Sequence, residues 1–330
     1  MNESHKAHLC ALLDRAGLNA MFRRSTRHRL KVIAYHGVLP APRDEAAYGS
    51  LHISLASFEA HLAHLRACYC VLALDEAVAH LRAGKSLPAN AVALTFDDGY
   101  ANTLDVALPA LAARGMSATH YVCTRLAEEG THLWYDALRS LVFARHGAGR
   151  AAERAYFALV HQVGSGSTGT AHARTAELLR EARMTEDHLR TRLRDLRLLT
   201  WEEIRRLAGS GHAVGSHTRS HALLDQVDHA TVVDEIRGSY DDLAKELGAV
   251  PGSFAFPDGR LTREALEVVR TTGYRSAVTV DDRDNGPGAD PFQLARVVVS
   301  DHGHPAIFEA RLAGSLSFLR RWLRRGSRLR

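Results

Sequence analysis

Short apolar runs alternate along this chain with longer segments in which apolar residues recur at helical spacing. The runs at residues 32–35, 92–96 and 118–122 predict buried strands. Between them, a segment capped by Ser54 or Ser57 and the segment 75–83 have the spacing of amphipathic helices, and a short strand is expected at 71–74. Strands and helices that alternate at short intervals predict a parallel α/β architecture.

This alternation stops between residues 133 and 199, where the pattern is helical with little strand character. We interpret this segment as a helical insertion over one end of the sheet. It contains the sequence GSGSTG at 164–169, which fits GxGxxG. A dinucleotide site requires a strand before this motif, whereas the segment before it here is helical, so a flexible Gly/Ser loop is favoured.

The alternation resumes at Thr200, which forms a predicted capping box with Glu203. Helices are expected at 230–247 and, capped by Thr262, up to residue 272. The remaining strands are expected at 212–216, 253–256, 276–280 and 296–299. The chain ends add an amphipathic helix at 4–22 with a basic linker to residue 30, and a basic helix or tail within 308–329. The expected organisation is therefore an N-terminal helix and linker at 1–30, one main domain at 31–310, and a tail at 311–330.

Composition and charge narrow the classes of function. The chain has 330 residues, 46% of them hydrophobic, which suffices for a large core in one domain or two smaller ones. The net charge is +5, but much of the excess comes from arginines after residue 319, so the body is close to neutral. Nucleic-acid binding is therefore not expected.

The four cysteines fit neither a zinc knuckle nor a disulfide framework, which favours a reducing compartment. The sequence shows neither a signal-peptide pattern near residue 1 nor an apolar run of the roughly 18 to 20 residues that a membrane span requires. A cytoplasmic location is expected. The tail FLRRWLRR suits an anionic membrane surface, which would place the protein at the inner membrane face; a solvated basic end is the alternative.

Two groups of polar residues follow predicted strands. Asp97 and Asp98 come directly after the run 92–96 and before Gly99, a residue that permits a sharp turn. An ordinary surface turn is the alternative, but the position after a buried strand favours function.

His217 and His221 follow the strand at 212–216. On a helical turn, a spacing of four places both rings on one side, where they can share a metal. With 20 histidines in the chain, chance alone gives about one such pair, so the spacing by itself is weak evidence. Two imidazoles and one carboxylate leave an open position for water on zinc or a similar ion, as in hydrolytic metal sites.

The motifs together carry more information than any one alone. YHGV at 35–38, VALTFDDGY at 92–100, GSHTRSH at 215–221 and SFAFPDG at 253–259 occur in this order. This set resembles the NodB-type polysaccharide deacetylases, carbohydrate esterase family 4, over most of residues 32–312. The fourth motif is similar to that of the exopolysaccharide-type subgroup.

The resemblance implies a distorted (β/α) barrel with fewer than eight clean repeats and a site at the C-terminal ends of its strands. It implies that Asp97 is the general base and that Asp98, His217 and His221 hold a divalent metal, Zn²⁺ above all. The implied reaction is removal of acetyl groups from N-acetylated sugars of a polysaccharide or of its lipid-linked precursor. A backbone N–H near Gly99 and Tyr100 would help to stabilise the oxyanion.

The sequence departs from the family pattern at two supporting positions. The arginine that orients the base is absent from SFAFPDG, and Arg296 in a later LPR-like segment is the candidate replacement; the alternative is a surface residue at a strand end. The general acid is also not evident. His302, His304 and His36 are the candidates, and for each the alternative is a loop or substrate-lining histidine.

Two other functions remain open at this stage. One is a deformylase or other amide hydrolase acting on a small or lipid-linked molecule. The other is a non-catalytic carbohydrate-binding protein, against which the intact Asp97, Asp98, His217 and His221 argue.

Overall fold

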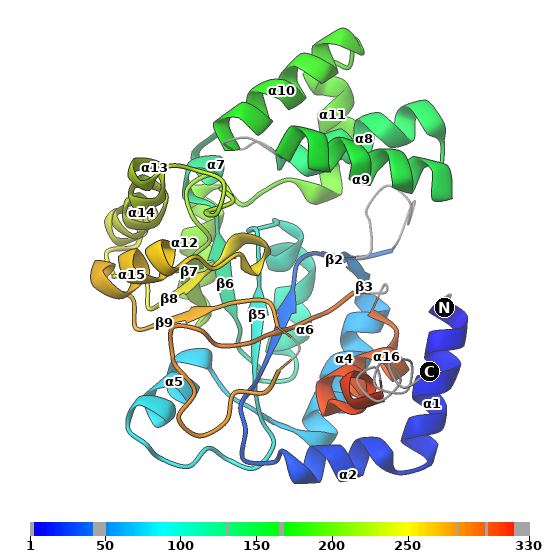
Figure 1. Ribbon diagram of the computed structural model, residues 1–330, viewed down its shortest axis with the longest axis vertical. Helices are drawn as coiled ribbons and strands as arrows, with labels where there is room; N and C mark the ends of the chain where they lie inside the picture. Colours follow the sequence, from blue (N-terminus) through cyan, green and yellow to red (C-terminus); the bar gives the residue numbers. More distant parts are fainter. Residues whose placement is uncertain are drawn as a thin grey trace, which may run out of the picture.

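A curled sheet of parallel strands forms the centre of the computed structural model, which describes residues 3–41, 51–129, 132–164, 168–281, 283–300 and 303–319 (Figure 1). The strand order is β10-β1-β5-β6-β7-β8-β9, with β4 also paired to β5. The strands are β1 (Lys31–Tyr35), β4 (Cys70–Val71), β5 (Ala91–Phe96), β6 (Thr119–Val122), β7 (Ala213–Ser216), β8 (Ser253–Ala255), β9 (Ser276–Val278) and β10 (Val297–Val298), and β2 (Val38–Leu39) and β3 (Ile53–Ser54) form a separate pair.

The two edges of the sheet meet just before β10. The N–H of Leu294 donates to the carbonyl of Ala277 at 3.0 Å, and the N–H of Thr279 donates back to the carbonyl of Leu294 at 2.8 Å. These bonds connect β9 to the segment that leads into β10 and β1. The predicted distorted (β/α) barrel is confirmed.

Helices cover the outside of the barrel (Figure 1). They are α4 (Leu55–Cys68), α5 (Leu74–Arg82), η1 (Thr103–Ala107), α6 (Leu108–Ala112), α7 (Thr124–Glu129), α12 (Trp201–Gly209), α13 (His229–Val233), η3 (Asp234–Gly238), α14 (Ser239–Leu247), α15 (Arg263–Thr272) and α16 (Pro305–Ala313). The short helix η4 (Pro257–Gly259) instead follows the C-terminal end of β8. Because helices outside and side chains inside cover both faces of the sheet, every residue of β1 and β5 is buried. The apolar runs in the sequence reflect this two-sided burial.

The segment between α7 and α12 forms a helical unit above one end of the barrel, green in Figure 1. It consists of α8 (Trp134–His146), α9 (Arg150–Gly164), α10 (Thr168–Glu181), α11 (Glu186–Arg192) and η2 (Arg194–Leu196). We call residues 134–196 the helical insertion. Residues 165–167 of the GSGSTG sequence lie outside the described residues, but helix α9, not a strand, precedes them.

The terminal helices differ from the prediction. Residues 4–22 form two helices, α1 (Glu3–Arg15) and α2 (Leu18–Ser25), because Gly17 adopts a left-handed conformation with φ of 73°. Helix α1 packs on α16 through a cluster that includes Cys10 and Ala310. At the other end, α16 begins at Pro305 and ends before Gly314, whose φ is 90°. Residues 320–330, most of the predicted basic tail, lie outside the described residues.

Local signals predicted helix starts better than strand ends. Ser54, Thr200 and Thr262 accept a backbone hydrogen bond as N-caps, and Thr200 forms the predicted capping box with Glu203. The strand expected at 71–74 is shorter, because β4 ends at Val71 and α5 already begins at Leu74. Within the described residues, no helix is both long enough and apolar enough to span a bilayer.

Candidate active site

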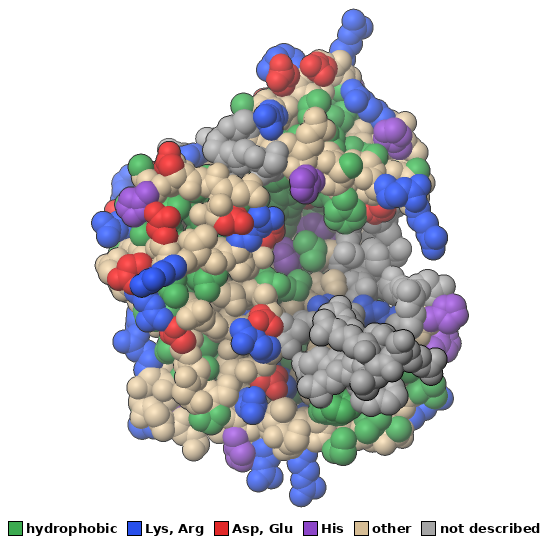
Figure 2. All heavy atoms as spheres, in the orientation of Figure 1, with side chains coloured by type: hydrophobic (Ala, Val, Ile, Leu, Met, Phe, Trp, Pro, Cys, Tyr) green, Lys and Arg blue, Asp and Glu red, His purple; other side chains and the backbone are tan. Residues whose placement is uncertain are grey.

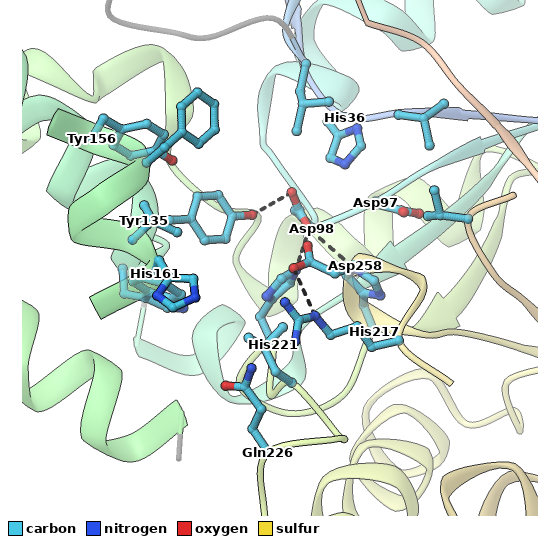
Figure 3. A pocket seen from close by; sticks show the side chains of 18 residues that line it. His36, Asp97, Asp98, Tyr135, Tyr156, His161, His217, His221, Gln226 and Asp258 are labelled. Carbon is cyan, nitrogen blue, oxygen red and sulfur yellow. Dashed lines mark hydrogen bonds and ion pairs between the residues drawn. The ribbon is translucent and has the colours of Figure 1, made fainter. Parts of the chain in front are cut away.

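A cavity of about 720 Å³ opens where the strands end, between the barrel and the helical insertion (Figure 2). The residues after β5 and β7 form its floor, and residues of α8 and α9 form one wall. Figure 3 shows Asp97, Asp98, His217 and His221 grouped at the floor, with Tyr135, Tyr156 and His161 on the side of the helical insertion.

The three predicted metal ligands converge at the floor of this cavity. The Nε2 atoms of His217 and His221 each lie 3.4 Å from Oδ1 of Asp98. One donor atom from each residue lies within 4.8 Å of the others, and all three side chains are buried. The two rings do not lie on a helical turn, as we expected. They lie on a tight turn in which Thr218 and His221 have φ of 67° and 59°.

Three of the six described non-glycine residues with positive φ lie in the loops that carry Asp98, His217 and His221. Asp98 has a φ of 73°, and Gly99, which follows it, has a φ of 80°. A Cβ on Gly99 would lie 3.2 Å from Cγ1 of Val122 on the neighbouring strand, so this turn requires glycine. Left-handed conformations of ordinary residues are costly and are retained at functional sites, where the surrounding fold enforces them.

The three side chains fit a divalent cation. Oδ1 of Asp98 is buried and has no hydrogen-bond partner among the described residues, although it faces two imidazole nitrogens. His217 uses its Nδ1 to donate to the carbonyl of Ala255 at 2.8 Å, which leaves the Nε2 lone pair directed at the cluster. Two imidazoles and a carboxylate are a donor set that zinc and similar ions accept.

Electrostatics also favour an ionised Asp98. Burial raises the pKa of this carboxyl, but its interaction with the facing imidazoles of His217 and His221 more than offsets burial and holds the pKa well below its usual range. The hydroxyl of Tyr135, from helix α8, donates to Oδ2 of Asp98 at 2.8 Å. Asp98 therefore presents Oδ1 to the cluster while Oδ2 is held from the other side.

A buried glutamate supports the loop between the two histidines. Glu235, on η3, accepts hydrogen bonds from the backbone N–H groups of Arg219 and Ser220 at 2.8 and 2.9 Å, and from the Ser220 hydroxyl at 2.6 Å. The hydroxyl of Thr218 accepts from the N–H of Ala222 at 3.2 Å. Thr218 thus makes a local hydrogen bond, whereas Ser220 is held by Glu235, a residue outside the motif.

Asp97 lies beside the cluster and is held by Arg296. The two guanidinium nitrogens Nη1 and Nη2 each donate to one carboxylate oxygen of Asp97 at 2.6 Å. Arg296 also donates to the hydroxyl of Thr95 and to the carbonyl of Thr279, each at 3.0 Å. It has no exposed surface, so it is not the surface residue that we considered as the alternative.

This pairing determines the charge of Asp97. Burial raises the pKa of Asp97, but the charge of Arg296 and its hydrogen bonds to the carboxylate more than offset burial and hold the pKa below its usual range. A carboxylate with this environment is ionised at neutral pH.

The three histidines considered as the general acid lie in different places. His36 follows β1, lines the cavity with Asp97, and has a buried Nδ1 without a hydrogen-bond partner among the described residues. His304 is exposed at the N-cap of α16, where its Nδ1 accepts from the N–H of Ala306. His302 lies outside the described residues. His161 of α9 also lines the cavity and was not predicted.

The helical insertion supplies further residues near the donor cluster, of which Tyr135 was not predicted. Tyr135 contacts Asp98, and its neighbour Asp136 is buried and accepts a hydrogen bond from the hydroxyl of Tyr100 at 2.8 Å. Burial raises the pKa of Asp136 to about 7. The only sequence signal was the aromatic and acidic run Trp134-Tyr135-Asp136 at a helix start, which does not reveal a partner on another element.

Comparison with known proteins places this geometry in a family. The sequence pattern of the polysaccharide deacetylase family matches residues 84–277. YxkH of Bacillus subtilis (strain 168), which is named for the same family, is 29% identical over 276 residues, covering 82% of this chain and 72% of that protein.

Solved structures agree on the fold. IcaB from Ammonifex degensii superposes with a TM-score of 0.57 at 22% identity, covering 87% of this chain and 97% of the other. The Streptococcus pyogenes deacetylase PplD, solved in complex with acetate, gives a TM-score of 0.56 at 19% identity, covering 82% of this chain and 92% of PplD. The matched segment is more than half of the chain and contains both the paired acids and the paired histidines. The chain belongs to the polysaccharide deacetylase family and is a hydrolase of amide C–N bonds.

Proposed function

We propose that this protein is a metal-dependent N-deacetylase that removes acetyl groups from N-acetylated sugars of a polysaccharide or of its lipid-linked precursor. One observation carries the proposal. Asp98, His217 and His221 form a buried donor cluster, and an ionised Asp97 that is fixed by Arg296 lies beside it in the same cavity.

The donor cluster would hold the ion, and Zn²⁺ suits its two imidazoles and one carboxylate. When bound, a divalent cation supplies Lewis acidity and lowers the pKa of water. The residues of the chain supply the remaining functions. Asp97 accepts the proton of the attacking water, and Arg296 fixes both oxygens of Asp97 so that its orientation does not change between turnovers.

A second proton must reach the departing amine. His36 is the candidate acid that the described residues offer, because its imidazole lines the cavity and its Nδ1 is buried without a partner among them. The backbone N–H groups near Gly99 and Tyr100, at the end of β5, are the proposed donors to the oxyanion. The products are a free amino sugar and acetate.

Membership of the exopolysaccharide-type subgroup is a further part of the proposal. The motif SFAFPDG lacks the usual arginine, and Arg296 occupies the position next to Asp97 instead. We also propose a cytoplasmic location with peripheral contact to the inner membrane face through the arginine-rich end of the chain. Equal sedimentation with anionic vesicles before and after removal of residues 318–330 would contradict that contact.

Acetate release tests the proposed function. The full chain, loaded with Zn²⁺, is incubated with N-acetylglucosamine oligomers and with a panel of other N-acetylated glycans, and acetate and formate are both measured. We expect acetate from at least one glycan and loss of that activity on chelation. Formate release from N-formyl substrates alone would favour the deformylase, and binding of glycans without any hydrolysis would favour the carbohydrate-binding protein.

A further inference from the structure

Exposed apolar side chains gather at the mouth of the active-site cavity. The described residues contain seven large hydrophobic side chains that are exposed, and three of them line this one cavity. They are Phe157, Val280 and Leu51, with 64%, 43% and 38% of their surface exposed. Isolated exposed apolar residues are ordinary, but three around one opening form a patch that calls for a partner.

These residues come from separate parts of the fold. Phe157 lies on α9 of the helical insertion, Val280 follows β9 of the barrel, and Leu51 precedes β3. Figure 2 shows hydrophobic side chains on both sides of the hollow between the helical insertion and the barrel. Two elements that meet across an opening therefore present apolar groups to whatever occupies it.

The apolar surface continues on the side of the helical insertion. Trp134, Tyr156 and Val160 of the helical insertion also line the cavity. Polar groups, including Gln226 and Asp258, line the side of the barrel. A ligand in this cavity thus meets the donor cluster at the floor and both apolar and polar side chains nearer the mouth, where Asp258 is also exposed.

The side chains at the mouth distinguish two kinds of apolar ligand. The flat face of a sugar packs on aromatic rings, which Tyr156 and Phe157 could provide. Val280 and Leu51 are aliphatic and have no planar face to offer. Their exposed surface is removed from water most effectively by a hydrocarbon chain.

We propose that the mouth of the cavity binds the hydrocarbon part of an amphiphilic glycoside, whose N-acetylated sugar reaches the donor cluster. This inference rests on the proposed function and selects the lipid-linked precursor over the finished polysaccharide as the substrate. The cavity, at about 720 Å³, is within the range of pockets that enclose a drug-sized ligand. The hydrocarbon lies between Phe157 and Val280.

A chain-length series tests this assignment. The full-length protein is titrated calorimetrically with the methyl, butyl, hexyl and octyl β-glycosides of N-acetylglucosamine, each below its micelle-forming concentration, and acetate release is followed on the same compounds. We expect Kd to fall by up to about fourfold for each CH₂ group that is buried. A Kd that does not change from methyl to octyl would overturn the proposal.

Two variants locate the effect. Phe157→Asp and Val280→Asp should each weaken binding of the hexyl glycoside at least tenfold more than binding of the methyl glycoside. Val250→Asp is the matched control, because Val250 is 55% exposed but lies before β8, away from the cavity. Equal losses for methyl and hexyl glycosides, or the same loss in the control, would overturn the proposal.

The series separates this inference from the proposed function. Chain-length-dependent binding without acetate release would refute the deacetylase assignment for these sugars and support the apolar site. Acetate release with the same kcat/KM for every chain length would support the deacetylase and overturn the apolar site.

Discussion

Replacing Arg296 with methionine leaves the Asp97 carboxylate inside the protein without its guanidinium partner. The substitution removes two charge-assisted bonds of 2.6 Å to Asp97 and two bonds of 3.0 Å to Thr95 and Thr279. Arg296 has no exposed surface and Asp97 has 3%, so solvent cannot replace these contacts. Breaking a buried pair by removing one partner costs about 3 to 5 kcal/mol, and we expect a loss of stability in this range.

A double-mutant cycle separates the pair from the rest of the arginine's contacts. In Asp97→Asn/Arg296→Met no buried carboxylate remains uncompensated, so the double variant should be more stable than the sum of the single effects by about 2 to 3 kcal/mol. Arg296→Lys keeps the charge but loses the planar fork, and should lie between wild type and Arg296→Met.

The assay is urea unfolding of the metal-free proteins at pH 7, followed by circular dichroism and fluorescence to verify a single transition. Loss of less than about 1 kcal/mol in Arg296→Met, or strict additivity in the cycle, would refute the claim that Arg296 compensates the charge of Asp97.

Three further predictions follow from contacts around the cluster. Tyr135→Phe, which removes a hydrogen bond to Asp98, should weaken Zn²⁺ binding about 10- to 100-fold in a chelator competition, whereas Tyr156→Phe, in the same cavity, should not; equal affinities would contradict this. Glu235→Ala, which leaves two loop N–H groups without an acceptor, should lower the free energy of unfolding in urea by about 2 to 4 kcal/mol and weaken Zn²⁺ binding. If both quantities are unchanged, the loop does not depend on Glu235. Burial raises the pKa of Asp136 to about 7, so the folded state binds a proton that the unfolded state releases near pH 4, and stability should fall as pH rises from about 4 to 7 and then level. Asp136→Asn should remove this fall, which amounts to about 4 kcal/mol at most, and parallel pH profiles of the two metal-free proteins would contradict it.

The apolar pattern indicated a parallel α/β fold because its strands are buried on both faces, and the family resemblance implied the barrel. Residues 91–96 form a continuous apolar run for this reason, and the acids that follow must lie at the end of a strand. The position of Asp97 and Asp98 was therefore accessible from local pattern alone. Helix starts were accessible for a similar reason, since the capping box at Thr200 is complete within four residues.

Contacts between distant elements were not accessible in this way. Arg296 reaches Asp97 across 199 residues because the barrel closes between β9 and β10, and no local pattern distinguishes a buried arginine there from an exposed one. Tyr135 and Glu235 act on the ligands from other elements, so their roles depend on packing. The histidine pair was recognised, but its expected helical geometry was wrong because Thr218 and His221 adopt left-handed conformations.

Acetate release by the Zn²⁺-loaded Asp97→Asn variant, with bound zinc quantified in the same sample, tests the central claim most directly. Asp97 is not one of the three residues in the donor cluster, so the variant should retain one zinc ion per chain. Loss of the base should reduce turnover about 10²- to 10⁴-fold. Full activity in this variant would contradict the assignment of Asp97 as the base, and loss of the zinc together with the activity would contradict the division of roles between Asp97 and Asp98.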